Sequence, residues 1–188
     1  MAKEILIIDI ETTNFLKEGG SIVEVGMVAL DLESGVTKII FDSLCREKIL
    51  TGRHREPPFG WIFKNSDLTV EEVREAPDFD SLRAEIQSII NAYPLGATAY
   101  NRSFDFDFLE SRSLSFPKKL PCPMLLCTDI CKIPSPYRYK DYKWPKVEEA
   151  WDYFFPDHPY DEKHRGADDA LHEAKIVYEL YKQGQFVV

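Results

Sequence analysis

The chain begins with a short apolar run that ends in two acidic residues. Ile5 to Ile8 are all apolar, and Asp9 and Glu11 follow in the stretch IDIETTN. Such a run is typical of a buried β-strand, so residues 4–10 are predicted to form one. Residues two apart on a strand share a face, so both acids point the same way. Because like charges repel, either this stretch lies in open solvent or a positive group lies between the acids.

Two more strand patterns follow the first one. Residues 21–31 (SIVEVGMVALD) and 36–44 (VTKIIFDSL) are rich in β-branched residues, and Glu33-Ser34-Gly35 is a turn signal between them. We therefore expect a hairpin that pairs antiparallel beside the first strand. Residues 46–66 are predicted to be irregular.

Helix and strand patterns alternate in the rest of the chain. Apolar spacing and N-cap residues predict five helices, at residues 69–76, 79–93, 104–113, 146–154 and 167–183. Short apolar runs predict two further strands, at 96–101 and 123–130. Three strands followed by alternating helices and strands predict a mixed α/β sheet with helices on its faces. No repeat or linker interrupts the pattern, so we expect one domain over residues 1–188.

The composition is that of a globular protein. The 188 residues are 44% hydrophobic and 29% charged. No apolar run approaches the roughly 18 residues that span a bilayer, and Asp9 interrupts the first run too early for a secretory signal. We expect a cytoplasmic protein that does not associate with a membrane.

Four cysteines fit that compartment as free thiols: Cys45, Cys122, Cys127 and Cys131. The last three have the spacing C-x4-C-x3-C, which would be a partial zinc site. Structural zinc sites usually use more closely spaced cysteine pairs and need a fourth ligand. We therefore interpret these cysteines as small buried hydrophobic residues.

The net charge of −9, with a pI near 5.0, argues against a nucleic-acid binder, because such proteins usually present a basic surface. An enzyme built around divalent cations escapes this objection, since the bound ions invert the local field.

Three further candidates fall at predicted element ends, where catalytic residues are often mounted. Asp105 begins a helix after a strand, and Asp169 lies in the first turn of the last helix, shortly after His164. Taken singly, the two aspartates could merely complement helix dipoles, and the histidine could be an ordinary surface residue. With Asp9 and Glu11, however, they form an oxygen-rich set suited to two Mg²⁺ or Mn²⁺ ions, whose charge would remove the repulsion between the acids.

These motifs, in this order, resemble the DEDDh (DnaQ-like) 3′–5′ exonucleases. IDIETT resembles the first motif with Asp9 and Glu11, and YNRSFDFDFL resembles the second with Asp105. HRGADDA resembles the third motif, in which a histidine lies five residues before an aspartate, giving His164 and Asp169. SIVEVGMV and LTVEEVREAPDF also resemble family segments, so the likeness spans nearly the whole chain.

The resemblance implies a ribonuclease H-like fold, with a mixed five-stranded sheet flanked by helices. It implies that the four acids hold two metal ions and that His164 is the general base for the attacking water. It further implies that backbone groups of Thr12 and Thr13 contact the 3′ end of the substrate. Phe15 and Leu16 are expected to pack on the terminal base.

Several neighbouring residues compete for these roles. Asp107 lies about 200° around the helix from Asp105 and should face away. Asp168 is disfavoured by its spacing from His164, and His158 lies too far from the third motif to be the base. We interpret His172 and Glu173 as part of a solvated helix face.

The window 132–146 (KIPSPYRYKDYKWPK) combines five basic residues and one acid with interleaved aromatics. Lys140 and Lys143 are candidates for binding substrate phosphates beside stacked bases. The equally weighted alternative is a solvated loop whose aromatic residues pack inward.

The predicted function is a metal-dependent exonuclease that removes 5′-mononucleotides from single-stranded DNA or RNA with a free 3′ end. A polymerase or another replication or repair protein is a conceivable partner. The main alternative is a non-catalytic nucleic-acid-binding or polymerase-associated module with the same fold. A hydrolase that acts on small phosphodiesters or dinucleotides is a third possibility.

Overall fold

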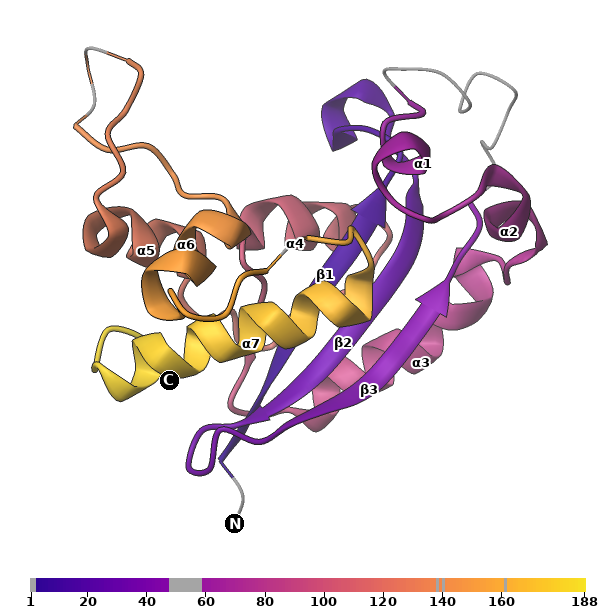
Figure 1. Cartoon of the computed structure of the whole chain (residues 1–188). Helices are drawn as coiled ribbons and strands as arrows, with labels where there is room; N and C mark the ends of the chain where they lie inside the picture. Colours follow the sequence, from indigo (N-terminus) through magenta and orange to yellow (C-terminus); the bar gives the residue numbers. More distant parts are fainter. Residues whose placement is uncertain (1–2, 48–58, 138, 140, 161) are drawn as a thin grey trace.

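The computed structural model describes residues 3–47, 59–137, 139, 141–160 and 162–188, and its centre is a four-stranded mixed sheet (Figure 1). The strands are β1 (Glu4–Thr12), β2 (Ile22–Asp31), β3 (Thr37–Leu44) and β4 (Ala97–Thr98), in the order β3-β2-β1-β4. β1 and β3 pair antiparallel with β2, and the short β4 pairs parallel with β1. The predicted hairpin and its place beside the first strand are confirmed.

The expected fifth strand is wrong, because residues 123–130 form most of helix α5 (Pro123–Cys131). Pro123 occupies the first turn of the helix, where its missing N–H costs nothing. The buried residues of α5, Pro123 and Cys127, are four apart, which is a helical spacing. A short apolar run does not by itself distinguish a strand from a buried helix, and here the proline was the better signal.

The other predicted helices are present within two residues of their expected bounds. The helical elements besides α5 are η1 (Leu16–Glu18, a 3-10 turn), α1 (Ile62–Asn65), α2 (Val70–Glu75), α3 (Phe79–Ala92), α4 (Arg102–Ser111), α6 (Val147–Phe154) and α7 (Gly166–Lys182). α1 was not predicted and lies in the segment expected to be irregular. A capping box between Thr69 and Glu72 starts α2, where a helix start was expected.

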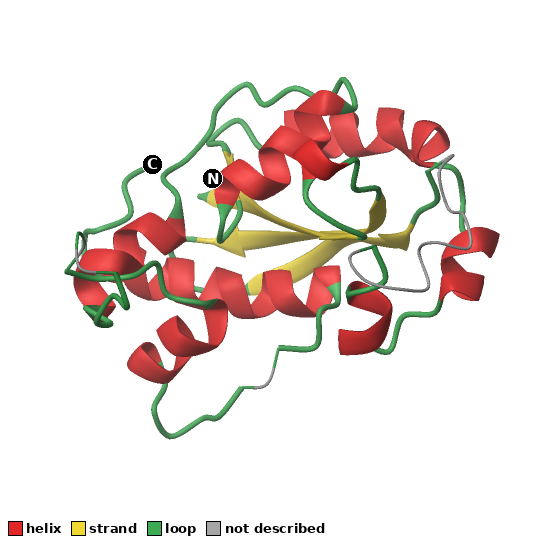
Figure 2. Cartoon of the chain, turned by 90° about the horizontal axis from the view of Figure 1, so that it is seen from above, coloured by secondary structure: helices red, strands yellow, loops and turns green. Residues whose placement is uncertain are grey.

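Helices cover both faces of the sheet (Figure 2). On one face, Ile5 and Ile7 of β1 pack with residues of α6 and α7 such as Val177. On the other face, Leu6 and Ile8 pack with residues of α3 and α4. Because successive residues of a strand alternate between faces, Asp9 and Glu11 continue the series that faces α7.

A contact between two glycines brings the start of α7 onto the sheet. Gly26 of β2 lies opposite Asp9 in the strand register, and Gly166 is the first residue of α7. A Cβ atom on Gly26 would lie 2.1 Å from the carbonyl carbon of Gly166, so no larger residue fits without displacing the helix. This close approach places the first turn of α7 beside the two acids of β1.

None of the helices in the described ranges combines the length and the apolar character needed to cross a bilayer.

Candidate active site

The four predicted acids converge at the end of β1 where the strand leaves the sheet. Asp9 and Glu11 come from β1, Asp105 from the first turn of α4, and Asp169 from the first turn of α7. Asp105 and Asp169 are buried, although carboxylates are rarely buried without a compensating partner. The structure therefore brings together three elements whose acids are far apart in the sequence.

Asp105 is fixed by the edge of β1. The pairing of β4 with β1 includes only Leu6 and Ile7, so the backbone of β1 beyond them has no strand partner on that side among the residues that the structure describes. The N–H of Ile10 instead donates to Oδ1 of Asp105 at 3.1 Å. A buried N–H needs such an acceptor, so the short β4 explains why a carboxylate is held at this point.

Asp169 is held through both of its oxygens. The backbone N–H of Arg165 donates to Oδ2 at 2.8 Å, and the hydroxyl of Tyr160 donates to Oδ1. These contacts orient the carboxylate at the helix start, where the dipole of α7 also favours a negative charge.

His164 lies next to this cluster. Glu11, His164 and Asp169 each offer one potential ligand atom, and the three atoms lie within 4.8 Å of one another. His164 has a φ of 54°, in the left-handed region that few residues other than glycine adopt. Its ring meets the ring of Trp61 edge-on, with centroids 4.9 Å apart, and its Nδ1 lies 3.8 Å from Oε1 of Glu162.

The electrostatics of the cluster favour cations. Burial is the main cause that raises the pKa of Asp9 well above its usual range, and repulsion from Glu173, Glu11 and the two buried aspartates adds to it. Burial likewise raises the pKa of Glu11, and it raises the pKa of Asp105 to about 8. Oδ2 of Asp9 is buried and has no hydrogen-bond partner among the described residues. An unpartnered carboxylate oxygen surrounded by acids fits a divalent metal ion.

A fifth carboxylate, Glu173, belongs to the same cluster, and its interpretation as part of a solvated face was wrong. Glu173 is only 3% exposed, and its Oε2 accepts a hydrogen bond from the N–H of Tyr100 at 3.2 Å. Burial and then the charge of Asp105 raise its pKa well above the usual range. Its position four residues after Asp169, on the same helix face, was the signal in the sequence.

His172 is not on a solvated face either. It is half-buried, and its ring stacks on the ring of Tyr160 with centroids 3.9 Å apart. It therefore packs behind the tyrosine that holds Asp169.

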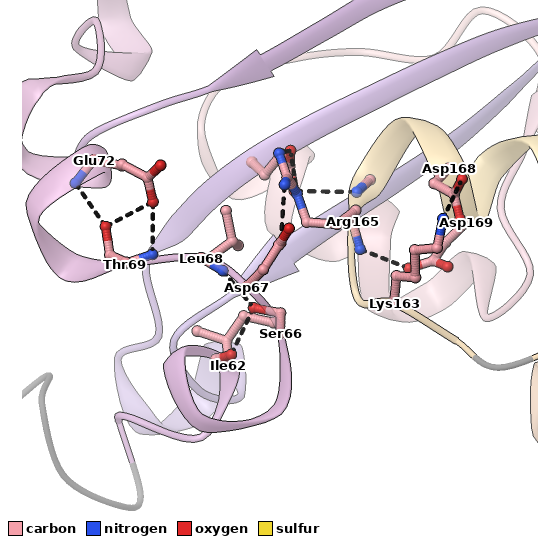
Figure 3. A network of polar contacts seen from close by, with 12 residues as sticks. Ile62, Ser66, Asp67, Leu68, Thr69, Glu72, Lys163, Arg165, Asp168 and Asp169 are labelled. Carbon is pink, nitrogen blue, oxygen red and sulfur yellow. Dashed lines mark hydrogen bonds and ion pairs between the residues drawn. The ribbon is translucent and has the colours of Figure 1, made fainter.

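A second carboxylate that the sequence did not reveal is Glu24 of β2. It lies opposite Glu11 in the strand register, is 1% exposed, and is paired with Arg165 at 2.9 Å. Oε2 of Glu24 also accepts from the N–H of Gly166 at 3.2 Å. Figure 3 shows that Arg165 reaches Asp67 as well, so one guanidinium ties β2, the segment before α2 and the start of α7 together.

Glu162 is a further acid beside the site. Burial and the charge of Asp169 raise its pKa to about 7. Since it faces Nδ1 of His164, it can influence the orientation of that ring.

The competing residues lie apart from the cluster. Asp107 is exposed on α4, as predicted. Asp168 interacts with Lys163 instead (Figure 3). It also lies 3.7 Å from Nδ1 of His172. His158 is exposed, in the loop after α6.

A cavity of about 340 Å³, which we call the terminal cavity, opens beside the acids. Its lining runs from Ile10 to Phe15 and includes Trp61 and Phe104. Thr13 is buried, and its N–H donates to the carbonyl of Ser21 at 2.9 Å, so that N–H is already engaged within the protein. The hydroxyl of Thr12 donates to the carbonyl of Asn14 at 3.1 Å.

The structure gives little support to Lys140 and Lys143 as phosphate-binding residues. Lys140 lies outside the described residues, and Lys143 forms an ion pair with Glu149. Tyr137 and Tyr139 stack on each other and are exposed, so these two aromatic residues do not pack inward.

The four cysteines are free thiols. Within the described ranges, Glu11, His164 and Asp169 form the one group of three or more side chains with metal-binding geometry, so the cysteines form no such group.

Comparisons with known proteins agree with this geometry. A family model described as an exonuclease, RNase T, matches residues 6–177. No curated protein shows a significant match to the sequence.

Several solved structures share the fold. A 3′-exonuclease that recognises the 3′ end of a histone mRNA stem-loop has a TM-score of 0.70 at 18% identity, covering 100% of this chain and 85% of that one. The nuclease domain of a 3′-exonuclease described as a DEDDh family member, bound to rAMP, has a TM-score of 0.68 at 19% identity, with coverages of 99% and 96%. S. pombe Pop2p with Mg²⁺ and Mn²⁺ bound has a TM-score of 0.66 at 12% identity, with coverages of 95% and 83%. The fold of this chain is therefore ribonuclease H-like.

Proposed function

This chain belongs to the RNase T family of exonucleases, of the DEDDh type, and from that membership we propose that it releases 5′-mononucleotides from the 3′ end of single-stranded nucleic acid. The members of this family are nucleases that depend on divalent metal ions. The observation that carries the proposal is the buried Oδ2 of Asp9, which has no hydrogen-bond partner among the described residues and lies amid the carboxylates of Glu11, Asp105, Asp169 and Glu173. A protein that only binds nucleic acid has no need of such a costly arrangement.

Asp9, Glu11, Asp105 and Asp169 are the residues that would hold two Mg²⁺ or Mn²⁺ ions. The fit rests on their oxygen-only chemistry and on the burial and the repulsion between acids that together raise the pKa of Asp9. When bound, two such ions neutralise charge on the attacking and leaving oxygens of a phosphodiester. The buried hydrogen bonds to Asp105 and Asp169 hold these carboxylates in place before any substrate arrives.

His164 is the proposed general base, which takes a proton from the attacking water. Its proximity to Glu11 and Asp169 supports this role. Trp61 and Glu162 border its ring from two sides and thereby limit its orientations. A positioned base contributes about 10²–10⁴-fold to such a reaction.

The terminal cavity is the proposed site of the 3′-terminal nucleotide. Its volume lies within the range of about 300–1,000 Å³ typical of small-molecule sites. The aromatic side chains of Phe15 and Trp61 form part of its lining. Aromatic faces stack on any base, so this cavity gives no reason to expect strong sequence preference. Glu11 in its lining connects it to the acids.

The direct test uses single-stranded DNA and RNA labelled at either end, with Mg²⁺, Mn²⁺ or EDTA. We expect a 3′-labelled substrate to release its label at once as a mononucleotide. A 5′-labelled substrate should become shorter one nucleotide at a time, and EDTA should stop both reactions. Internal cleavage, digestion from the 5′ end, or equal activity in EDTA would refute the proposal. Binding without any degradation would favour the non-catalytic module.

A further inference from the structure

Glu173 is a buried acid that does not belong to the four motif acids, Asp9, Glu11, Asp105 and Asp169. It lies on α7 and is 3% exposed. Among the neighbouring charges that add to burial in raising the pKa of Asp9, the charge of Glu173 has the largest effect, ahead of that of Glu11. Because such effects weaken with distance, Glu173 is as much a part of the acid cluster as the motif acids are.

Glu173 is held at the place where β1 and β4 separate. β4 is only two residues long and pairs with β1 over those two residues. Beyond this point the N–H of Ile10, on β1, donates to Asp105, and the N–H of Tyr100, just after β4, donates to Oε2 of Glu173 at 3.2 Å. Each of the two carboxylates therefore satisfies a buried backbone donor where the strands no longer pair.

Tyr100 is itself fixed on three sides. Its carbonyl accepts the N–H of Met124, at the start of α5, at 3.0 Å. Its hydroxyl lies within 3.1 Å of the carbonyl oxygens of both Pro145 and Lys146, before α6. The N–H that binds Glu173 therefore has a fixed position, and the carboxylate is held beside the motif acids before any ion arrives.

The hydrogen bond alone does not require a carboxylate. The amide oxygen of glutamine accepts from an N–H equally well, and a buried neutral amide costs less than a buried charge. Burial is the main cause that raises the pKa of Glu173, and the charges that add to it are those of Asp105, Asp169 and Glu162, which are all acids. What the carboxylate supplies beyond the hydrogen bond is a negative charge, which attracts any cation that the cluster binds.

We propose that Glu173 is a fifth acid of the metal centre and that its charge strengthens the binding of divalent ions by the four motif acids. This inference rests on the proposed function. Four carboxylates balance the charge of two divalent ions, so the fifth gives the site an excess of negative charge. Because Oε2 is engaged by Tyr100, Glu173 acts beside the motif acids and replaces none of them.

Calorimetric titration of Mn²⁺ without substrate measures this effect on the wild type and on Glu173→Gln. The substitution removes the charge and keeps an oxygen that accepts from Tyr100. The Kd for Mn²⁺ should rise about 10–100-fold, as is typical when a residue that supports metal ligands is changed. The Mn²⁺ concentration that gives half-maximal hydrolysis should rise with it.

The matched control is Glu179→Gln, the same change on the same helix. The side chain of Glu179 pairs with Lys182 at 2.6 Å, and Glu179 is not among the charges that act on Asp9 or Glu173. This variant should bind Mn²⁺ with the Kd of the wild type.

Melting temperatures separate the charge from a structural role. In EDTA, Glu173→Gln should melt above the wild type, because repulsion within the cluster is relieved. Saturating Mn²⁺ should then raise its Tm by less than it raises the Tm of the wild type at the same concentration. Glu173→Leu should melt below Glu173→Gln in EDTA, since leucine leaves the N–H of Tyr100 without its acceptor.

An unchanged Kd for Mn²⁺ in Glu173→Gln would overturn the inference. So would a Glu173→Gln variant that melts below the wild type in EDTA, because weaker Mn²⁺ binding would then reflect a damaged fold. Either result leaves the exonuclease intact as long as the wild type binds Mn²⁺ and degrades its substrates. A wild type that does neither would refute the proposed function as well.

Discussion

The charge of Asp105 should destabilise the protein in the absence of metal, and replacing it with the neutral amide should reverse this effect. Burial raises the pKa of Asp105 from 3.8 to about 8. A carboxyl group with a raised pKa binds its proton more tightly in the folded state than in the unfolded state. The metal-free protein therefore loses stability as the pH rises from about 4 to about 8, and the loss levels off above that range.

The size of the effect follows from the shift. A difference of about 4 pKa units corresponds to an upper limit of roughly 5–6 kcal/mol at about 1.4 kcal/mol per unit. Asp105→Asn removes the charge, and its Oδ1 still accepts the hydrogen bond from Ile10. Because the amide keeps part of the burial cost, we expect a gain of roughly 2 kcal/mol or more at pH 8, or about 4–8 °C in Tm.

Thermal unfolding followed by circular dichroism, in EDTA at pH 5 and pH 8, measures this gain. Asp105→Asn should melt above the wild type at pH 8, and this advantage should disappear at pH 5, where folded wild-type protein keeps Asp105 largely protonated. Asp107→Asn, the same change two positions along at an exposed site, should melt like the wild type at both pH values. A wild-type Tm equal to that of Asp105→Asn at pH 8, or a difference in Tm that does not change with pH, would show that the buried charge of Asp105 does not destabilise the fold.

Two further predictions concern the base and the buried ion pair. His164→Ala should lower kcat by about 10²–10⁴-fold while Mn²⁺ binding survives. His158→Ala should change kcat little. The reverse pattern would show that the wrong histidine has been assigned as the base. Arg165→Ala leaves Glu24 buried without its partner and should cost about 3 kcal/mol in urea unfolding. Arg83→Ala, which breaks an exposed pair, should cost under about 1 kcal/mol, and equal losses in the two variants would contradict the role given to burial.

The sequence predicted most of the fold because its long elements carry strong periodic patterns. The strand at β1 and the helix at α7 were placed within two residues, since each has a continuous apolar run or stripe. Residues 123–130 misled the prediction because their short apolar run, residues 123–127, suits a strand as well as a helix.

The candidate site divides along similar lines. The predicted acids at element ends converge because the topology brings those ends together, and motif order was enough to find them. Glu173 was missed because the usual preference of glutamate for solvent outweighed its position one turn after Asp169. Glu24 could not be interpreted at all, since its partner Arg165 lies 141 residues away and their pairing exists only in three dimensions.

The proposed function requires that the acid cluster hold the metal ions on which hydrolysis depends. Titration of Mn²⁺ in the presence of a 5′-mononucleotide, measured by calorimetry alongside activity, tests it most directly. We expect two ions per chain for the wild type and for Asp107→Asn, with loss of binding and of hydrolysis together in Asp9→Asn. If Asp9→Asn retained two ions, or if hydrolysis continued undiminished without bound ions, the acid cluster would not be the metal site on which hydrolysis depends.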